Sequence, residues 1–200
     1  EGQAMGVSTG RHPDGAPVFR ELARRSAGAP NRSPLGRDIV INEIMYAPIS
    51  GETEDEYVEL YNQGTSAVDL SSWKFVAGIE FTFPTNTVLR PNGYLVVAKN
   101  AARLSTNYPN LNVGNTVGDF GGRLSNRGCR IALAKPETVA RRNSNGVLET
   151  NTTYVVVDEV TYGTGGRWGQ WSDGGGSSLE LIDPRSDHRL ASNWADSDET

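Results

Sequence analysis

The sequence predicts an all-β chain folded as an antiparallel β-sandwich or barrel. Short apolar segments alternate with turn signals along most of the chain, and no segment sustains the apolar period of a helix. The connections between these segments are too short for the helical crossovers of a parallel sheet. The 23 glycines and 10 prolines supply the many turns that such a fold needs.

The strands can be assigned in order from the composition and alternation of each segment. The first is expected at 39–46, a β-branched run that ends at Ala47-Pro48. The second, 57–62, alternates between apolar and polar positions. Further strands are expected at 73–76, 80–83, 87–89 and 94–98, then a strand, turn and strand across 123–133, a long strand at 154–162 and a last one at 177–182. Two other segments read differently, with a helical turn near 101–104 and a polar loop across about 135–152.

The alternation of these strands also predicts the core. Positions that share one face of a half-buried strand recur every second residue. The predicted core comprises Ile39, Ile41, Val58, Leu60, Trp73, Phe75, Leu95, Val97, Ile131, Leu133, Val156 and Val160.

Charge and texture divide the chain into three parts. Residues 1–37 carry six arginines and three acids, a net charge of +3, and we expect an extended, mostly irregular segment or the end of a preceding module. Residues 38–182 form the predicted sandwich. Residues 183–200 are polar and acidic, with Trp194 as an apolar anchor, and are expected to be a linker.

Composition excludes several classes of protein. The net charge of −5 disfavours general attraction to DNA or anionic lipid, so strong nucleic-acid binding is not expected. No apolar run approaches the ~20 residues of a membrane helix, so membrane insertion is not expected. One cysteine permits neither an internal disulfide nor a cysteine metal cluster.

Few residues suggest catalysis. His12 and His188 lie in polar segments with no nucleophile motif beside them, so both are interpreted as surface histidines without a role. Cys129 alternates with Ile131 and Leu133 and has no neighbouring histidine, so we interpret it as a buried structural thiol. We expect no catalytic residue, no cofactor and no metal site, and therefore no enzyme.

Acidic residues leave one question open. Glu52, Glu54, Asp55 and Glu56 form a loop that reads as solvated, yet calcium could bind there if enough oxygen ligands converged. Neither this loop nor the acids at Asp158 and beyond match the EF-hand spacing. A pair of glycosidase carboxylates need not be adjacent in sequence, so a hydrolytic site remains an alternative.

Two glycine-rich segments, 163–169 and 173–178, lack the phosphate-binding pattern and read as turns. Four side chains in and beside them are the candidate ligand-binding residues: Tyr162, Arg167, Trp168 and Trp171. Exposed tryptophans could form a platform for sugar or peptide, whereas packing at the edge of the core is the alternative.

At this point the chain resembles the lamin tail domain family. The carrying residues are IVINEIMYAP (39–48), EYVELYNQGTSAVDLSSWKF (56–75), FTFP (81–84), TVLRPNGYLVVAKN (87–100), GRLSNRGCRIALA (122–134) and VVVDEVTYG (155–163). The resemblance implies an immunoglobulin-like β-sandwich. It departs from nuclear lamins, because it has no coiled-coil rod, no basic nuclear signal and no prenylation box.

The resemblance also implies a setting. The larger bacterial versions of this domain are accessory modules, so a multidomain, secreted or cell-surface bacterial parent is expected, and an extracellular location with it. The expected function is a non-catalytic interaction or scaffolding module. Its partners would be neighbouring domains, or protein or glycan at the cell surface. The alternatives are a carbohydrate-binding module using Trp168 and Trp171, and an accessory domain of a hydrolase.

Overall fold

A computed structural model describes residues 8–11, 14–15, 19–22, 25–31, 38–142, 145 and 148–197. The chain divides into two compact units, residues 1–37 and residues 38–200. The division coincides with the change of texture at residue 38.

The first unit contains a short β-hairpin that the sequence reading of an irregular segment missed. Strand β1 (Ser8–Arg11) pairs antiparallel with β2 (Phe19–Leu22), so that Arg11 lies opposite Phe19. The Arg11 guanidinium lies 4.7 Å from the centre of the Phe19 ring. Asn31 also donates a hydrogen bond from Nδ2 to the Arg11 carbonyl at 2.9 Å. Contacts between distant residues therefore order this hairpin, since the four-residue strands have no long apolar alternation of their own.

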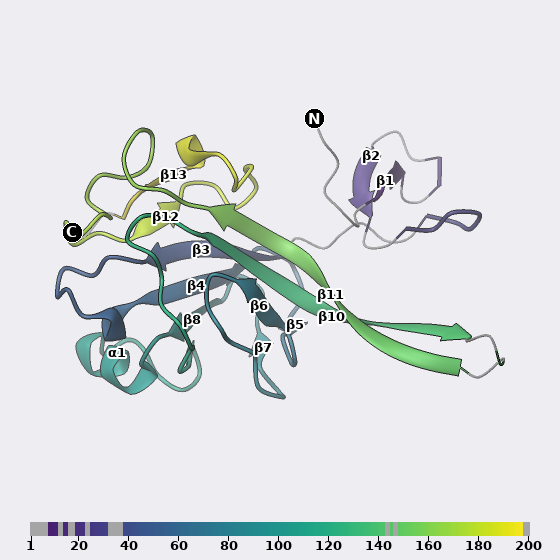
Figure 1. Ribbon diagram of the computed structural model, residues 1–200, viewed down its shortest axis with the longest axis horizontal. Coiled ribbons are helices and arrows are strands. Elements are labelled where there is room, and N and C mark those ends of the chain that lie inside the picture. Colours follow the sequence, from purple (N-terminus) through teal and green to yellow (C-terminus); the bar gives the residue numbers. More distant parts are fainter. Residues whose placement is uncertain are drawn as a thin grey trace. The chain divides into compact units, whose positions relative to one another are not determined.

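The second unit is a sandwich of two main sheets (Figure 1). The larger sheet has the order β13-β12-β3-β4-β8-β9 and the smaller has the order β11-β10-β6, with β5 and β7 as a separate pair. Neighbouring strands are antiparallel, except that β8 and β9 are parallel. The large sheet comprises β3 (Ile39–Met45), β4 (Tyr57–Asn62), β8 (Tyr94–Ala98), β9 (Thr116–Val117), β12 (Leu179–Leu181) and β13 (Trp194–Asp196). The other strands are β5 (Val68–Asp69), β6 (Lys74–Ala77), β7 (Val88–Leu89), β10 (Arg130–Arg142) and β11 (Leu148–Thr161). An all-β, immunoglobulin-like sandwich is thus confirmed.

Helical structure is confined to short pieces. Helix α1 (Ala101–Asn107) lengthens the helical turn expected near residue 101. Asn100 caps it, because its side chain accepts a hydrogen bond from the Arg103 amide. The 3₁₀ turns Thr53–Asp55 and Ala191–Asn193 complete the set for the described residues.

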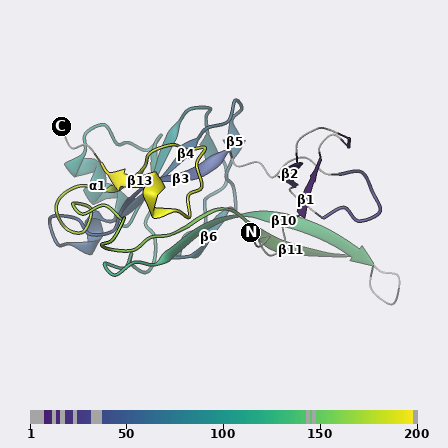
Figure 2. The ribbon, with the colours of Figure 1, turned by 90° about the horizontal axis from the view of Figure 1, so that it is seen from above.

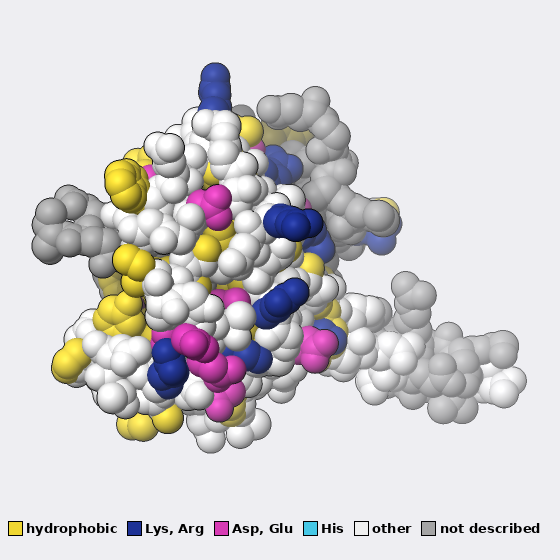
Figure 3. Space-filling view, turned by 60° about the vertical axis from the view of Figure 1, so that its left-hand side comes forward, with side chains coloured by type: hydrophobic (Ala, Val, Ile, Leu, Met, Phe, Trp, Pro, Cys, Tyr) yellow, Lys and Arg dark blue, Asp and Glu magenta, His cyan; other side chains and the backbone are white. Residues whose placement is uncertain are grey.

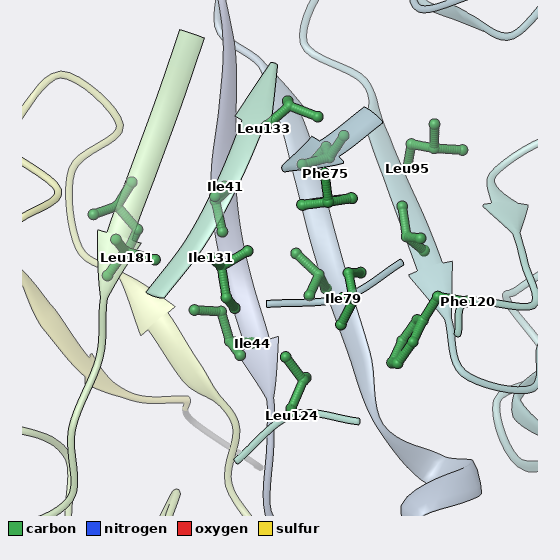
Figure 4. Close-up of a cluster of buried hydrophobic side chains, with 14 of the residues drawn as sticks. Ile41, Ile44, Phe75, Ile79, Leu95, Phe120, Leu124, Ile131, Leu133 and Leu181 are labelled. Atoms are coloured by element: carbon green, nitrogen blue, oxygen red, sulfur yellow. The ribbon is translucent and has the colours of Figure 1, made fainter. Parts of the chain in front are cut away.

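The core lies between the two sheets and follows the predicted alternation closely (Figure 4). Ten of the twelve predicted core residues are buried, and Trp73 is partly buried against the same cluster. Val156 is the exception, because a β-bulge intervenes. Leu133 pairs with Asp158 and Ala134 with Val156, which leaves Val157 as the extra residue, and Val157 is the buried one.

Four assignments made from the sequence are wrong in detail. Residues 80–83 form no strand and make only isolated bridges, Lys74 with Thr82 and Glu80 with Gly121. The strand expected before the turn at 126–128 is absent, since pairing begins only at Arg130. The last predicted strand shortens to β12. Most importantly, the predicted polar loop at 135–152 is largely a pair of strands, because β10 and β11 continue through it.

The segment from 183 onward is part of the fold and not a linker as far as residue 197. Its strand β13 pairs with β12, placing Trp194 opposite Leu181. Trp194 is 3% exposed and donates a hydrogen bond from Nε1 to the His188 carbonyl at 2.8 Å. Polar composition concealed this role, because one indole and one buried histidine hold the segment and neither creates an apolar period.

Candidate interaction surface

A long β-ribbon extends from the sandwich and is the most distinctive surface of the second unit. Strands β10 and β11 pair from Arg130 with Thr161 to Arg142 with Leu148. Strand β6 pairs with β10 only at residues 132–134. From Lys135 outward the ribbon therefore has two strands alone, and it runs clear of the sandwich in two perpendicular views (Figures 1 and 2).

The ribbon exposes both of its faces. Residues 150–154 are five consecutive exposed positions, and successive side chains of a strand point to opposite faces. In Figure 3 the described part of the ribbon, at the lower right, is mostly neither hydrophobic nor charged. Threonine accounts for this character, at Thr138, Thr150, Thr152 and Thr153. This surface suits main-chain recognition better than apolar burial.

Contacts at its base fix the ribbon where it leaves the sandwich. The Lys74 ammonium, on β6, lies 3.8 Å from the centre of the Tyr154 ring. Thr153 donates from Oγ1 to the Glu137 carbonyl at 3.3 Å, and Lys135 lies 3.6 Å from the Glu137 carboxylate. These contacts join β6, β10 and β11, so the sandwich sets the direction in which the ribbon leaves.

The four candidate ligand-binding residues do not form the predicted platform. Tyr162 is only 2% exposed, stacks on Tyr46 at 4.7 Å between ring centres, and donates to the Ser125 carbonyl at 2.9 Å. Trp168 is partly buried against the core, whereas Arg167 and Trp171 are exposed. Tyr162 alternates correctly for a core position at the end of β11, so its inclusion in a surface site was wrong. A ligand at Arg167 or Trp171 stays a prediction.

The loop that carries these tryptophans is held by a carboxylate from the C-terminal strand. Asp196 accepts hydrogen bonds from the backbone amides of Gln170 and Ser172 at 2.9 and 2.7 Å. Gly169 packs so closely on this carboxylate that an added Cβ would lie 2.2 Å from Asp196 Oδ1. The glycine-rich loop is thus a packed connection, and the glycine at 169 is required sterically.

The acidic loop at residues 52–56 is only partly solvated, which corrects the sequence reading. Asp55 receives two hydrogen bonds from Arg103, at 2.6 and 2.8 Å, and one from Ser50 at 2.6 Å. The hydrogen bonds from Arg103 lower the pKa of Asp55 despite its burial. Glu56 is 1% exposed and accepts from the Leu124 amide at 2.7 Å, while burial raises its pKa. These carboxylates tie the loop to α1 and to residues 123–124.

No metal site emerges from this loop or elsewhere in the described residues. Within the ranges 38–142 and 148–197 and the described part of the first unit, no group of three His, Cys, Asp or Glu side chains could hold a metal ion. The oxygens of Asp55 already accept several hydrogen bonds, so they are committed to the fold.

His188 is a buried structural residue, which overturns its interpretation as a surface histidine. It is 4% exposed, and its Nδ1 lies 2.8 Å from Asp158 Oδ1. Its Nε2 lies 3.0 Å from the Pro184 carbonyl. Because both ring nitrogens face acceptors, both carry protons and the ring is an imidazolium paired with Asp158. Asp158 also accepts from the Ile41 amide at 2.7 Å. His12 lies outside the described residues.

Cys129 is structural in position but only partly buried. It is a free cysteine that packs against the core cluster, and its Sγ lies 3.3 Å from Tyr162 Oη. It stands one residue before β10 begins, next to the turn glycine Gly128. The alternation that buries Ile131 and Leu133 therefore does not extend fully to Cys129.

A row of three glutamates crosses the large sheet, and sequence reasoning missed it. In the strand register Glu43 lies opposite both Glu59 and Glu180. Tyr57 and Ser178 donate to Glu43, and Asn42 donates to Glu59 at 3.0 Å. Burial, followed by the charges of Glu43 and Glu180, raises the pKa of Glu59 to about 7. Only the pairing of three strands brings these residues together, so no local signal could have identified them.

The face shown in Figure 3 carries acidic and basic side chains interspersed, without a continuous patch of one sign. Such a surface does not resemble a nucleic-acid footprint. None of the helices in the described parts of the chain is long and apolar enough to cross a membrane.

Comparison with known families identifies the chain. The family model described as Lamin Tail Domain matches residues 32–164, which is more than half of the chain. The chain therefore belongs to the lamin tail domain family, as its strand motifs predicted. No curated protein matches it, and no solved structure matches it. The matched span includes the ribbon and ends before β12 and β13, which nevertheless complete the large sheet.

Proposed function

We propose that this lamin tail domain is a non-catalytic interaction module that binds its partner through the β10–β11 ribbon. The observation that supports this most directly is the ribbon itself, which continues beyond β6 with both faces exposed. An isolated two-stranded ribbon is at best marginally stable in water, so retaining one this long is favourable when it gains contacts with a partner.

Two further features favour binding over catalysis. The family is a non-enzymatic, immunoglobulin-like one. The grouped carboxylates Glu43, Asp55 and Glu56 each accept hydrogen bonds from the fold, which leaves them poorly placed as acids or bases. The resemblance to bacterial accessory modules supports a parent protein that is secreted or on the cell surface, where the module would position neighbouring domains.

The test removes the ribbon and leaves the sandwich intact. Residues 138–152 are replaced by Asn-Gly, which joins Glu137 to Thr153, two residues that face each other in the ladder. A phage-displayed peptide library is then selected on the wild-type chain, and the enriched peptides are assayed on both proteins. We expect peptides that bind the wild-type chain and lose binding to the shortened one, while near-ultraviolet circular dichroism shows an intact core.

A matched control addresses the other exposed aromatic surface. Trp171→Ala removes a side chain that is 65% exposed and lies outside the ribbon. We expect this variant to bind the selected peptides like the wild type. Binding that survives removal of the ribbon but is lost in Trp171→Ala would contradict the proposal. Glycan binding with the same dependence on Trp171 would favour a carbohydrate-binding module instead.

A further inference from the structure

The two long edges of the ribbon are chemically different. The outer edge of β10 carries Lys135 and Pro136, and both residue types protect sheet edges against pairing. Strand β11 is the terminal strand of its sheet, and it has no Lys, Pro or Gly between residues 148 and 157. One edge is thus protected, and the other is open.

The position of Pro136 reveals which backbone groups face outward. A proline within a ladder places its nitrogen on the side away from the partner strand, because it has no hydrogen to donate. Pro136 lies opposite Tyr154. Directly opposed residues of an antiparallel pair either exchange both hydrogen bonds or point both sets of groups outward. Tyr154 therefore directs its own N–H and C=O away from β10, and so do Thr152 and Thr150.

These outward groups have no partner strand. Strand β11 pairs only with β10, and among the described residues no backbone hydrogen bond joins 150–157 to any other segment. The stretch 150–157 reads TNTTYVVV, which is rich in β-branched residues and contains no charge. Such an uncharged, strand-forming edge is a template for an added strand.

We propose that this edge binds the same edge of a second copy of the chain, forming an antiparallel, two-fold symmetric dimer through β11. The inference rests on the proposed function and names the ribbon's partner. A two-fold axis at Thr153 pairs Thr152 with Tyr154 of the other copy and Thr150 with Val156. In this register every outward N–H of one copy meets an outward C=O of the other, and no charged residues oppose each other within 150–156.

The chemistry of the edge favours an identical strand over a charged one. A strand rich in Lys, Arg, Asp or Glu would find no opposite charge along 150–157. The uncharged β11 strand itself meets the requirement. Pairing would also convert two marginal ribbons into one continuous sheet, which is more stable than either alone.

The ladder provides a matched pair of variants for the test. Thr138 and Thr152 lie directly opposite each other, both are exposed, and by the same alternation both direct their N–H groups outward. Thr152→Pro removes a donor from the open edge, whereas Thr138→Pro makes the same change on the protected edge. Sedimentation equilibrium of the full chain measures self-association in each case.

We expect the wild-type chain and Thr138→Pro to dimerise with similar dissociation constants, and Thr152→Pro to dimerise at least tenfold more weakly. A cross-link provides a second measurement that does not depend on folding of the proline variants. In a Cys129→Ser background, Thr153→Cys should form an intermolecular disulfide on mild oxidation, because the two copies of residue 153 meet at the axis.

Three results would overturn the dimer. They are a wild-type chain that stays monomeric, loss of association in Thr138→Pro, and association that continues into filaments, which would mean pairing of β10 with β11. A monomeric chain whose ribbon still binds selected peptides would refute the dimer and leave the proposed function standing.

Discussion

Replacing Glu59 by glutamine should stabilise the protein at neutral and alkaline pH. Glu59 lies on β4 between the protein interior and Glu43, and its pKa rises from an ordinary value of 4.5 to about 7. A carboxyl with a raised pKa binds its proton more tightly in the folded chain than in the unfolded chain. Its contribution to stability is therefore complete below pH 4.5 and is lost as the pH rises through 7.

The magnitude follows from the two pKa values. A difference from 4.5 to about 7 corresponds to about 3 kcal/mol at pH 8, because each pKa unit is worth about 1.4 kcal/mol. Glutamine is neutral at every pH and keeps the oxygen that accepts from Asn42. Glu59→Gln should therefore exceed the wild type by up to about 3 kcal/mol at pH 8 and match it near pH 4.

Urea unfolding at several pH values from 4 to 8 measures this difference directly. The matched control is Glu52→Gln, which neutralises an exposed glutamate outside the cluster and should change the free energy of unfolding little at any pH. The same difference between Glu59→Gln and wild type at pH 4 and pH 8 would refute the reasoning, and so would a destabilised Glu59→Gln at pH 8.

Three other predictions follow from buried or packed groups. His188→Ala should cost about 3 kcal/mol in urea unfolding, because it leaves the Asp158 carboxylate buried without its charged partner, and adding Asp158→Asn should recover part of that loss. A double variant less stable than His188→Ala would contradict this. Cys129→Arg should lower the thermal midpoint much more than Cys129→Ala, since the thiol packs against the core, and equal midpoints would count against that packing. Deleting residues 1–30 should leave a cooperative unfolding transition, because residues 38–200 form a compact unit of their own; a non-cooperative melt would show that the boundary is misplaced.

The sequence by itself determined the fold class, the family and most of the core. Val58 and Leu60, or Ile131 and Leu133, are buried because a strand with one face on a core must alternate, and alternation is a local property that can be read along the chain. The turn residues between such strands are equally local. This is why the strands at 39–45, 57–62 and 94–98 begin and end close to where composition predicts.

The tertiary structure decided everything that depends on which strands meet. The ribbon shows no apolar alternation because both of its faces are exposed, so its strands resembled a polar loop. The bulge at Leu133 and Ala134 exchanges the burial of Val156 and Val157, and only the ladder reveals the extra residue. The pairing of His188 with Asp158 spans 30 residues, and that of Glu43 with Ser178 spans 135. Local propensity contains no information about such contacts, because they form only when folding brings separate strands into one register.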